Sequence, residues 1–124
     1  MDQEKRKYAR VRQRLTTLVK FLDTGKVRRA LTRDIGAGGV CVVMEGVLEP
    51  GTMLEVELRL PDRQQPITFT ASVIWNRPLE TLTKSYEIPT TETGVTFVNI
   101  DPKERAFLMQ YAAMNPLPPE LGGT

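Results

Sequence analysis

The sequence predicts a mainly β domain, a small antiparallel barrel followed by one C-terminal α-helix. Three observations predict this class. Short apolar or alternating segments recur along the chain, separated by Gly, Pro and Asp, which are typical turn residues. A helical pattern of apolar residues occurs only near the end of the chain. The length of 124 residues suits one domain and is too short for two.

Six segments are expected to form strands. In chain order they are Leu15–Leu22, Val27–Thr32, Gly39–Met44, Met53–Leu60, Ile67–Trp75 and Gly94–Val98. The clearest alternation lies in 53–60, where the even-numbered residues are apolar and the odd-numbered ones are mostly charged. In 67–75 the same alternation groups Trp75 with Val73 on one face, which predicts that Trp75 is a core residue.

A long polar connection and a helix follow the fifth strand. Residues 76–93 hold Pro78 and Pro89 and are expected to form a connection of unusual length, which is often functional or disordered. The helix is expected to begin at Asp101, with Pro102 at its first position and Glu104 completing a capping box. Its apolar stripe is expected to pack on the barrel. That stripe consists of Phe107, Leu108, Tyr111, Ala112 and Met114.

Charge and hydropathy divide the chain into three parts. Residues 1–13 are strongly basic and are expected to form a flexible arm, 14–115 the barrel and helix, and 116–124 a disordered tail rich in Pro and Gly. No apolar run approaches the roughly 20 residues that span a bilayer, and the chain begins without the apolar segment of a signal peptide. We therefore expect a cytoplasmic protein with no membrane span.

The composition narrows the chemistry. The chain has no His and a single Cys, which excludes a structural zinc site, an internal disulfide and a His-based catalytic triad. No pair of acidic residues stands out from the surface charge, so no enzymatic activity and no cofactor are expected. The net charge of +2 also argues against a general binder of DNA or RNA, which needs a broad basic face.

Two motifs carry the functional signal. Arg6-Lys7-Tyr8-Ala9-Arg10 places two guanidinium groups four residues apart, and each can pair with phosphate oxygens or with the O6 and N7 acceptors of guanine. Asp34-Ile35-Gly36-Ala37-Gly38-Gly39 lies between two expected strands and holds a carboxylate beside flexible backbone. A strand follows this Gly-rich segment and no Gly-Lys-Ser/Thr closes it, so it is neither a dinucleotide fingerprint nor a P-loop.

In this order and spacing the two motifs resemble those of the PilZ family, RxxxR followed by (D/N)xSxxG. The segments 71–75, 94–97 and 101–105 also resemble later strands and the helix start of that family, so the resemblance covers nearly the whole chain. It implies a six-stranded antiparallel barrel that binds cyclic di-GMP, with the N-terminal arginine loop folded over the ligand. Carried onto this chain, Arg6 and Arg10 would contact guanines and phosphates, Asp34 would read a guanine, and Gly39 would permit close approach.

One position departs from the family pattern, because Gly36 stands where the family has serine. The missing hydroxyl removes one neutral hydrogen bond, worth roughly 0.5–1.5 kcal/mol, so weaker binding is expected rather than none. Lys5 is expected to help with a phosphate, and Arg33 to add a contact or to remain a solvated charge. Trp75 would stack on a guanine if it lay at the barrel surface instead of in the core.

The expected mechanism is a ligand-driven ordering of the basic arm over the barrel, which then signals to a downstream protein that the sequence does not identify. Two other functions stay open. A degenerate PilZ domain would bind no nucleotide and act as a protein-interaction adaptor, a hypothesis that Gly36 favours. A small barrel that binds RNA or DNA through its arm would show strong salt dependence and little base selectivity.

Overall fold

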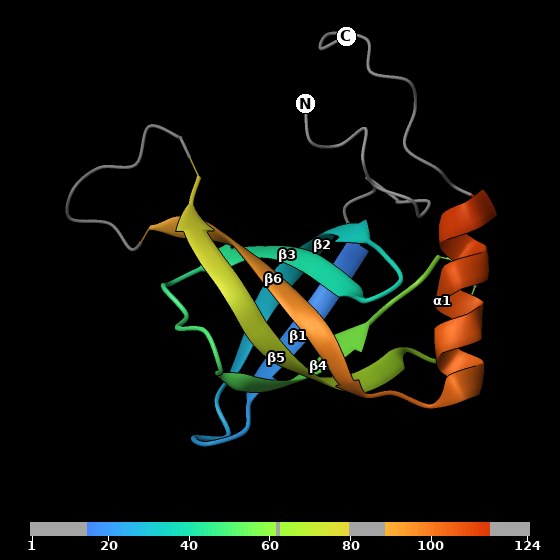
Figure 1. Ribbon diagram of the computed structural model, residues 1–124, viewed down its shortest axis with the longest axis horizontal. Helices are drawn as coiled ribbons and strands as arrows, with labels where there is room; N and C mark the ends of the chain where they lie inside the picture. Colours follow the sequence, from blue (N-terminus) through green and yellow to red (C-terminus); the bar gives the residue numbers. More distant parts are fainter. Residues whose placement is uncertain (1–14, 62, 80–88, 115–124) are drawn as a thin grey trace, which may run out of the picture.

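Six antiparallel strands and one helix make up the part of the chain that the computed structural model describes, which is residues 15–61, 63–79 and 89–114 (Figure 1). The elements are β1 (Leu15–Phe21), β2 (Val27–Ile35), β3 (Gly39–Glu45), β4 (Met53–Leu58), β5 (Ile67–Pro78), β6 (Thr90–Asn99) and α1 (Pro102–Met114). The expected arm, 1–13, and tail, 116–124, lie outside the described residues, as do Lys5, Arg6 and Arg10.

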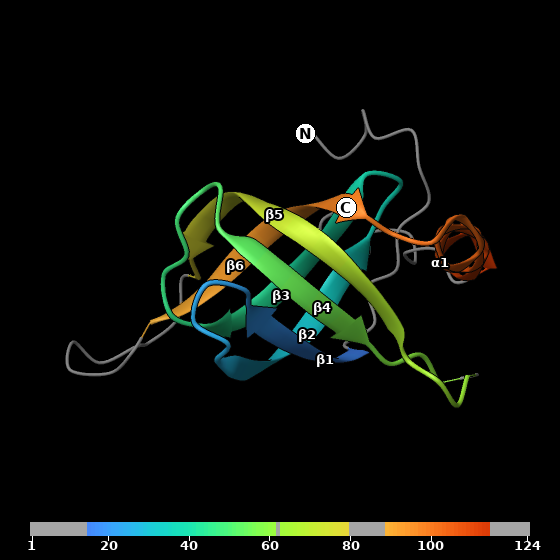
Figure 2. The same ribbon diagram turned by 90° about the horizontal axis from the view of Figure 1, so that it is seen from below.

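The strands close into a barrel in the order β1-β2-β3-β6-β5-β4, and β1 pairs with β4 to complete the ring (Figure 2). Most neighbours are also consecutive in sequence, as hairpin turns require. The exceptions are the closing pair of β1 with β4 and the pair of β3 with β6, which lies between β3 and β5 and is antiparallel to both. The predicted barrel with a C-terminal helix is therefore confirmed.

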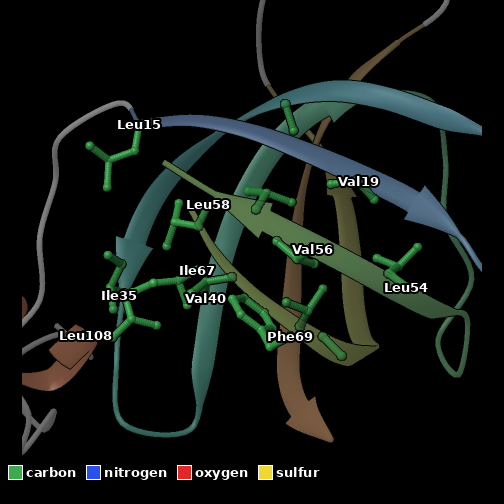
Figure 3. Close-up of a cluster of buried hydrophobic side chains, with 14 of the residues drawn as sticks. Leu15, Val19, Ile35, Val40, Leu54, Val56, Leu58, Ile67, Phe69 and Leu108 are labelled. Carbon is green, nitrogen blue, oxygen red and sulfur yellow. The ribbon is translucent and has the colours of Figure 1, made fainter. Parts of the chain in front are cut away.

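The core fills the barrel interior with mostly aliphatic side chains, joined by Phe69 (Figure 3). In β4 the alternation seen in the sequence holds, since Leu54, Val56 and Leu58 are fully buried while the residues between them are not. Two buried threonines, Thr17 and Thr32, also lie inside, and their hydroxyls are joined by a hydrogen bond of 2.7 Å. The Thr17 hydroxyl donates in turn to the Leu15 carbonyl at 2.8 Å, so neither hydroxyl is buried without a partner.

The β5 and β6 strands differ most from the sequence-based prediction. β5 continues to Pro78 and β6 begins at Thr90, so both ends of the expected connection 76–93 are strand; residues 80–88 lie outside the described part. The register shifts between Val73 and Trp75, which interrupts the alternation of β5. Because such an irregularity turns the following side chains to the opposite face, the prediction of Trp75 in the core is wrong. Trp75 is 37% exposed.

The helix α1 stands beside the barrel and buries Leu108, Tyr111 and Ala112 against it (Figure 1). The Asp101 carboxylate accepts a hydrogen bond of 2.7 Å from the Lys103 N–H, which confirms the predicted N-cap. Phe107 and Met114, expected in the apolar stripe, are exposed. In the described part of the chain, no helix has the length and apolar character to cross a membrane.

Candidate functional site

A row of four cross-strand neighbours crosses the outer face of the barrel. Asp34 on β2 lies opposite Cys41 on β3, Cys41 opposite Gly94 on β6, and Gly94 opposite Trp75 on β5. Val40 and Val42 on either side of Cys41 are buried in the core, so Cys41 and its partners in the row face outward. Asp34 is half-buried, and its Oδ1 atom has almost no exposed surface.

The two central residues of this row, Cys41 and Gly94, have small side chains or none, so little projects from the barrel surface between Asp34 and Trp75. The Trp75 indole lies directly over Gly94, since a Cβ atom built on Gly94 would overlap the ring. Arg77 also contacts the ring, since its guanidinium carbon lies 5.0 Å from the ring centroid, a cation–π geometry. The row therefore runs from a carboxylate, across a thiol, to an aromatic ring of limited mobility.

A buried carboxylate flanks the row. Glu92 on β6 points outward yet its side chain is only 7% exposed, because two arginines cover it. Arg33 from β2 forms an ion pair with one carboxylate oxygen, and Arg77 from β5 donates through Nε to the other at 3.0 Å. Arg33 lies at the register shift of β2 between Thr32 and Asp34, which lets its side chain reach across β3 to Glu92. Glu92 thus fixes one arginine beside Asp34 and the other against Trp75.

The Gly-rich segment closes the β2–β3 hairpin at one end of the row. The Gly36 N–H donates to the Gly39 carbonyl at 2.9 Å, so residues 36–39 form a tight turn. Gly39 lies against β6, where a Cβ atom would overlap the Val95 carbonyl and lie 2.9 Å from the Thr96 Cα. The close approach that Gly39 permits in this structure is therefore to the neighbouring strand.

The described candidates of the sequence analysis fall on one face. Arg33, Asp34 and Trp75 lie together on the outside of β2, β3, β6 and β5, and Gly36 and Gly39 lie in the turn that continues from Asp34. Sequence reasoning missed Cys41, Glu92, Gly94 and Arg77. Of these four, only Arg77 had a local signal in the sequence. It follows Trp75 by two residues, and side chains two apart on a strand share a face, so a contact between them could have been predicted. Within the described ranges, no group of three or more acidic or Cys side chains could hold a metal ion.

Solved structures with the same fold include three that cover most of this chain. MotI/DgrA, an inhibitor of motility from Bacillus subtilis, matches with a TM-score of 0.71 and 21% identity, over 89% of this chain and 50% of its own. The PilZ domain of Escherichia coli YcgR, solved with c-di-GMP, matches with a TM-score of 0.69 and 18% identity, over 90% and 91% of the two chains. PlzA of Borreliella burgdorferi, in complex with c-di-GMP, gives a TM-score of 0.59 and 9% identity over 90% of this chain and 54% of its own.

This chain thus spans about half the length of MotI/DgrA and PlzA but nearly all of the YcgR domain. The curated proteins include no match to the sequence. The family model of the PilZ domain matches residues 4–113, which is most of the chain. The chain belongs to the PilZ domain family.

Proposed function

We propose that this protein is a receptor for cyclic di-GMP, which binds on the outer face of the barrel over the row from Asp34 to Trp75. On binding, the basic arm becomes ordered across the ligand and presents a new surface to a partner protein. The observation that carries the proposal is the juxtaposition of a carboxylate, two arginines and a tryptophan on one face of the barrel.

The chemistry of this face suits a guanine nucleotide. A carboxylate such as Asp34 accepts hydrogen bonds from the N1–H and the exocyclic amine of guanine, which adenine and pyrimidines do not offer together. The exposed Trp75 ring provides an apolar surface for stacking. Arginine guanidiniums match phosphate oxygens bidentately. Arg33 and Arg77 have part of this capacity occupied by Glu92, so the phosphates are assigned mainly to Arg6, Arg10 and Lys5.

Chain length allows the arm to reach this face. Leu15 begins β1 and pairs with Thr32, two residues before Asp34. Arg10 precedes Leu15 by five residues, an extended span of at most about 17 Å, and neighbouring strands are only about 4.8 Å apart. Arg10 can therefore be brought over the row by the arm that the family model includes from residue 4.

Membership of the PilZ family and the likeness to the YcgR domain and PlzA, both solved with c-di-GMP, support the same ligand class. Because these two structures are only 18% and 9% identical to this chain, the residues that contact the ligand are proposed from this chain's own geometry. The proposal includes Gly36, which has no side chain and therefore offers the ligand space but no serine hydroxyl; its backbone N–H already donates to the Gly39 carbonyl.

Calorimetric titration of the purified protein with cyclic di-GMP, with GTP as a second ligand, tests this function. Saturable binding in the micromolar range or tighter is expected, and its stoichiometry follows directly. Asp34→Ala and Arg10→Ala should each weaken binding at least about tenfold, because a hydrogen bond to a charged group contributes about 1.5–3 kcal/mol. Arg59→Ala is the matched control, since Arg59 follows β4 on another part of the barrel and pairs with Glu57.

An adaptor without nucleotide is the second candidate, and the Gly36 position favours it. It predicts no heat and no thermal shift at high ligand concentration for the wild-type chain. Equal binding by wild type and Asp34→Ala would place the ligand elsewhere and would contradict the proposed site.

A further inference from the structure

The helix α1 is hydrogen-bonded to the Gly-rich turn of the candidate site. Arg105, in the first turn of α1, donates from Nη2 to the carbonyl oxygen of Ala37 at 2.7 Å. The two residues are 68 positions apart in sequence, so the bond joins the C-terminal helix to the β2–β3 hairpin. Figure 1 shows α1 beside the barrel on the side where β2 turns into β3.

The Ala37 bond is one of four that hold the carbonyl groups of this turn. The Gly38 carbonyl accepts from the Phe97 N–H at 2.9 Å and from the Thr96 hydroxyl at 3.0 Å, and the Gly39 carbonyl accepts from Gly36. Those partners are β6 and the turn itself. Arg105 differs because it is a side chain from an element outside the sheet.

The turn depends on such bonds because two of its glycines, Gly36 and Gly38, have few packing contacts. A Cβ atom on Gly38 would meet nothing within 4 Å, and on Gly36 only the Gly39 carbonyl at 3.8 Å. Glycine has the largest backbone freedom of any residue, so ordering this turn for a ligand has a high entropic cost. A peptide group is planar and trans, so fixing the Ala37 carbonyl toward α1 also turns the Gly38 N–H to the opposite side.

The backbone around Arg105 is fixed by hydrogen bonds and by packing of α1 on the barrel. Its backbone N–H donates to the Asp101 carbonyl at 2.9 Å, which closes the first helical turn. Beside it, Glu104 accepts two hydrogen bonds from Arg63, of 2.9 and 3.0 Å. The fully buried Leu108 packs the next turn of α1 into the core. The guanidinium therefore reaches the turn from an element whose position the barrel already determines.

We infer that Arg105 is a positioning residue, which orders the 36–39 turn for the ligand and couples occupancy of the site to the docking of α1. The inference rests on the proposed function. If the bond to Ala37 favours the binding-competent turn, ligand binding strengthens the bond by the same factor, because such coupling is reciprocal. A partner that contacts α1 can then sense whether the ligand is bound.

Hydrogen exchange of the ligand-free protein tests the first half of this inference. In Arg105→Ala the backbone amides of 36–39 should exchange about tenfold faster than in wild type, as loss of a charged hydrogen bond predicts. Arg105→Lys keeps a donor and the charge and should recover part of the protection. Lys103→Ala removes the same charge from the same exposed turn of α1 and should leave the exchange unchanged. Unchanged exchange in Arg105→Ala overturns the inference.

Titration with cyclic di-GMP tests the second half. Arg105→Ala should bind about tenfold more weakly than wild type, with Arg105→Lys between them and Lys103→Ala close to wild type. Ligand should also slow amide exchange in α1 of the wild type and not in Arg105→Ala. Equal weakening by Arg105→Ala and Lys103→Ala would mean that only charge matters and would overturn the inference. Failure of the proposed function differs: no ligand would bind the wild type, while Arg105→Ala would still speed exchange in the turn.

Discussion

The two adjacent glycines at the end of the Gly-rich turn have different surroundings. Gly39 begins β3 and lies so close to β6 that a Cβ atom would overlap the Val95 carbonyl, which is backbone and cannot rotate away. Gly38 has open space where its Cβ atom would be. Neither has the positive φ that would itself require glycine. The difference between them is therefore one of packing.

Replacing each glycine with alanine separates these surroundings experimentally. Gly39→Ala forces β3 and β6 apart and should lower the free energy of unfolding by about 1–3 kcal/mol, as overpacking does. Gly38→Ala should stay within about 0.5 kcal/mol of wild type. Urea denaturation of both variants measures the difference. Equal stability of the two would show that β6 yields at this point, and Gly39 would then be free for a ligand role.

At the scale of elements, Glu92 joins three strands by its side chain. It accepts from Arg33 on β2 and Arg77 on β5 while its own strand lies between β3 and β5. Burial is asymmetric, because the Glu92 side chain is 7% exposed whereas Arg33 is 37% and Arg77 is 69% exposed. Loss of the carboxylate lets both arginines return to water, but loss of Arg33 leaves a buried charge with less compensation.

This asymmetry predicts an order of stabilities. Arg33→Ala should cost about 1–3 kcal/mol of unfolding free energy, the penalty for a charged group deprived of a partner. Glu92→Gln should cost less, because the exposed arginines are resolvated and exposed pairs contribute only about 0–1 kcal/mol. The double variant Arg33→Ala/Glu92→Gln should be more stable than Arg33→Ala alone. A double-mutant cycle by thermal and urea unfolding measures this coupling, and strictly additive losses would contradict it.

Some elements could be predicted from their own sequence and others could not. Alternation in 53–60 correctly predicted the buried face of β4, and Asp101 correctly predicted the start of α1, because both signals are local. The position of Trp75 was not predictable, since the register shift after Val73 arises from pairing with β6, nearly twenty residues later. Once β5 is turned in this way, Asn76 points inward and its amide donates to the Thr91 and Thr93 hydroxyls at 2.9 and 2.7 Å.

The same limit applied to the site. Asp34 and the Gly-rich turn carry a sequence motif, but Glu92 gives no local signal, because only the barrel closure places it between Arg33 and Arg77. Arg105 was predictable as part of a helix start and not as a partner of Ala37, from which 68 positions separate it. Contacts of this kind follow from topology, so sequence patterns reveal them only after the strand order is known.

At the scale of the whole molecule, the fold and the proposed ligand function rest on different parts of the chain. Every buried core residue of the described part falls between Leu15 and Ala112, and β1 closes the ring against both β2 and β4. The motif arginines precede this region. Stability of the barrel is therefore expected to be independent of the arm, whereas affinity for the ligand depends on it.

Deletion of residues 1–10 tests this separation. The shortened protein should unfold cooperatively, with a midpoint within a few degrees of wild type, because the deletion removes none of the described core. It should lose cyclic di-GMP binding in the titration, since Lys5, Arg6 and Arg10 supply most of the cations proposed for the two phosphates. The variant with Arg6→Ala and Arg10→Ala in the full-length chain is the matched control and should lose binding equally. Retained binding after the deletion would mean that Arg33, Arg77 and Asp34 hold the ligand on the barrel alone, and ordering of the arm would no longer explain the signal.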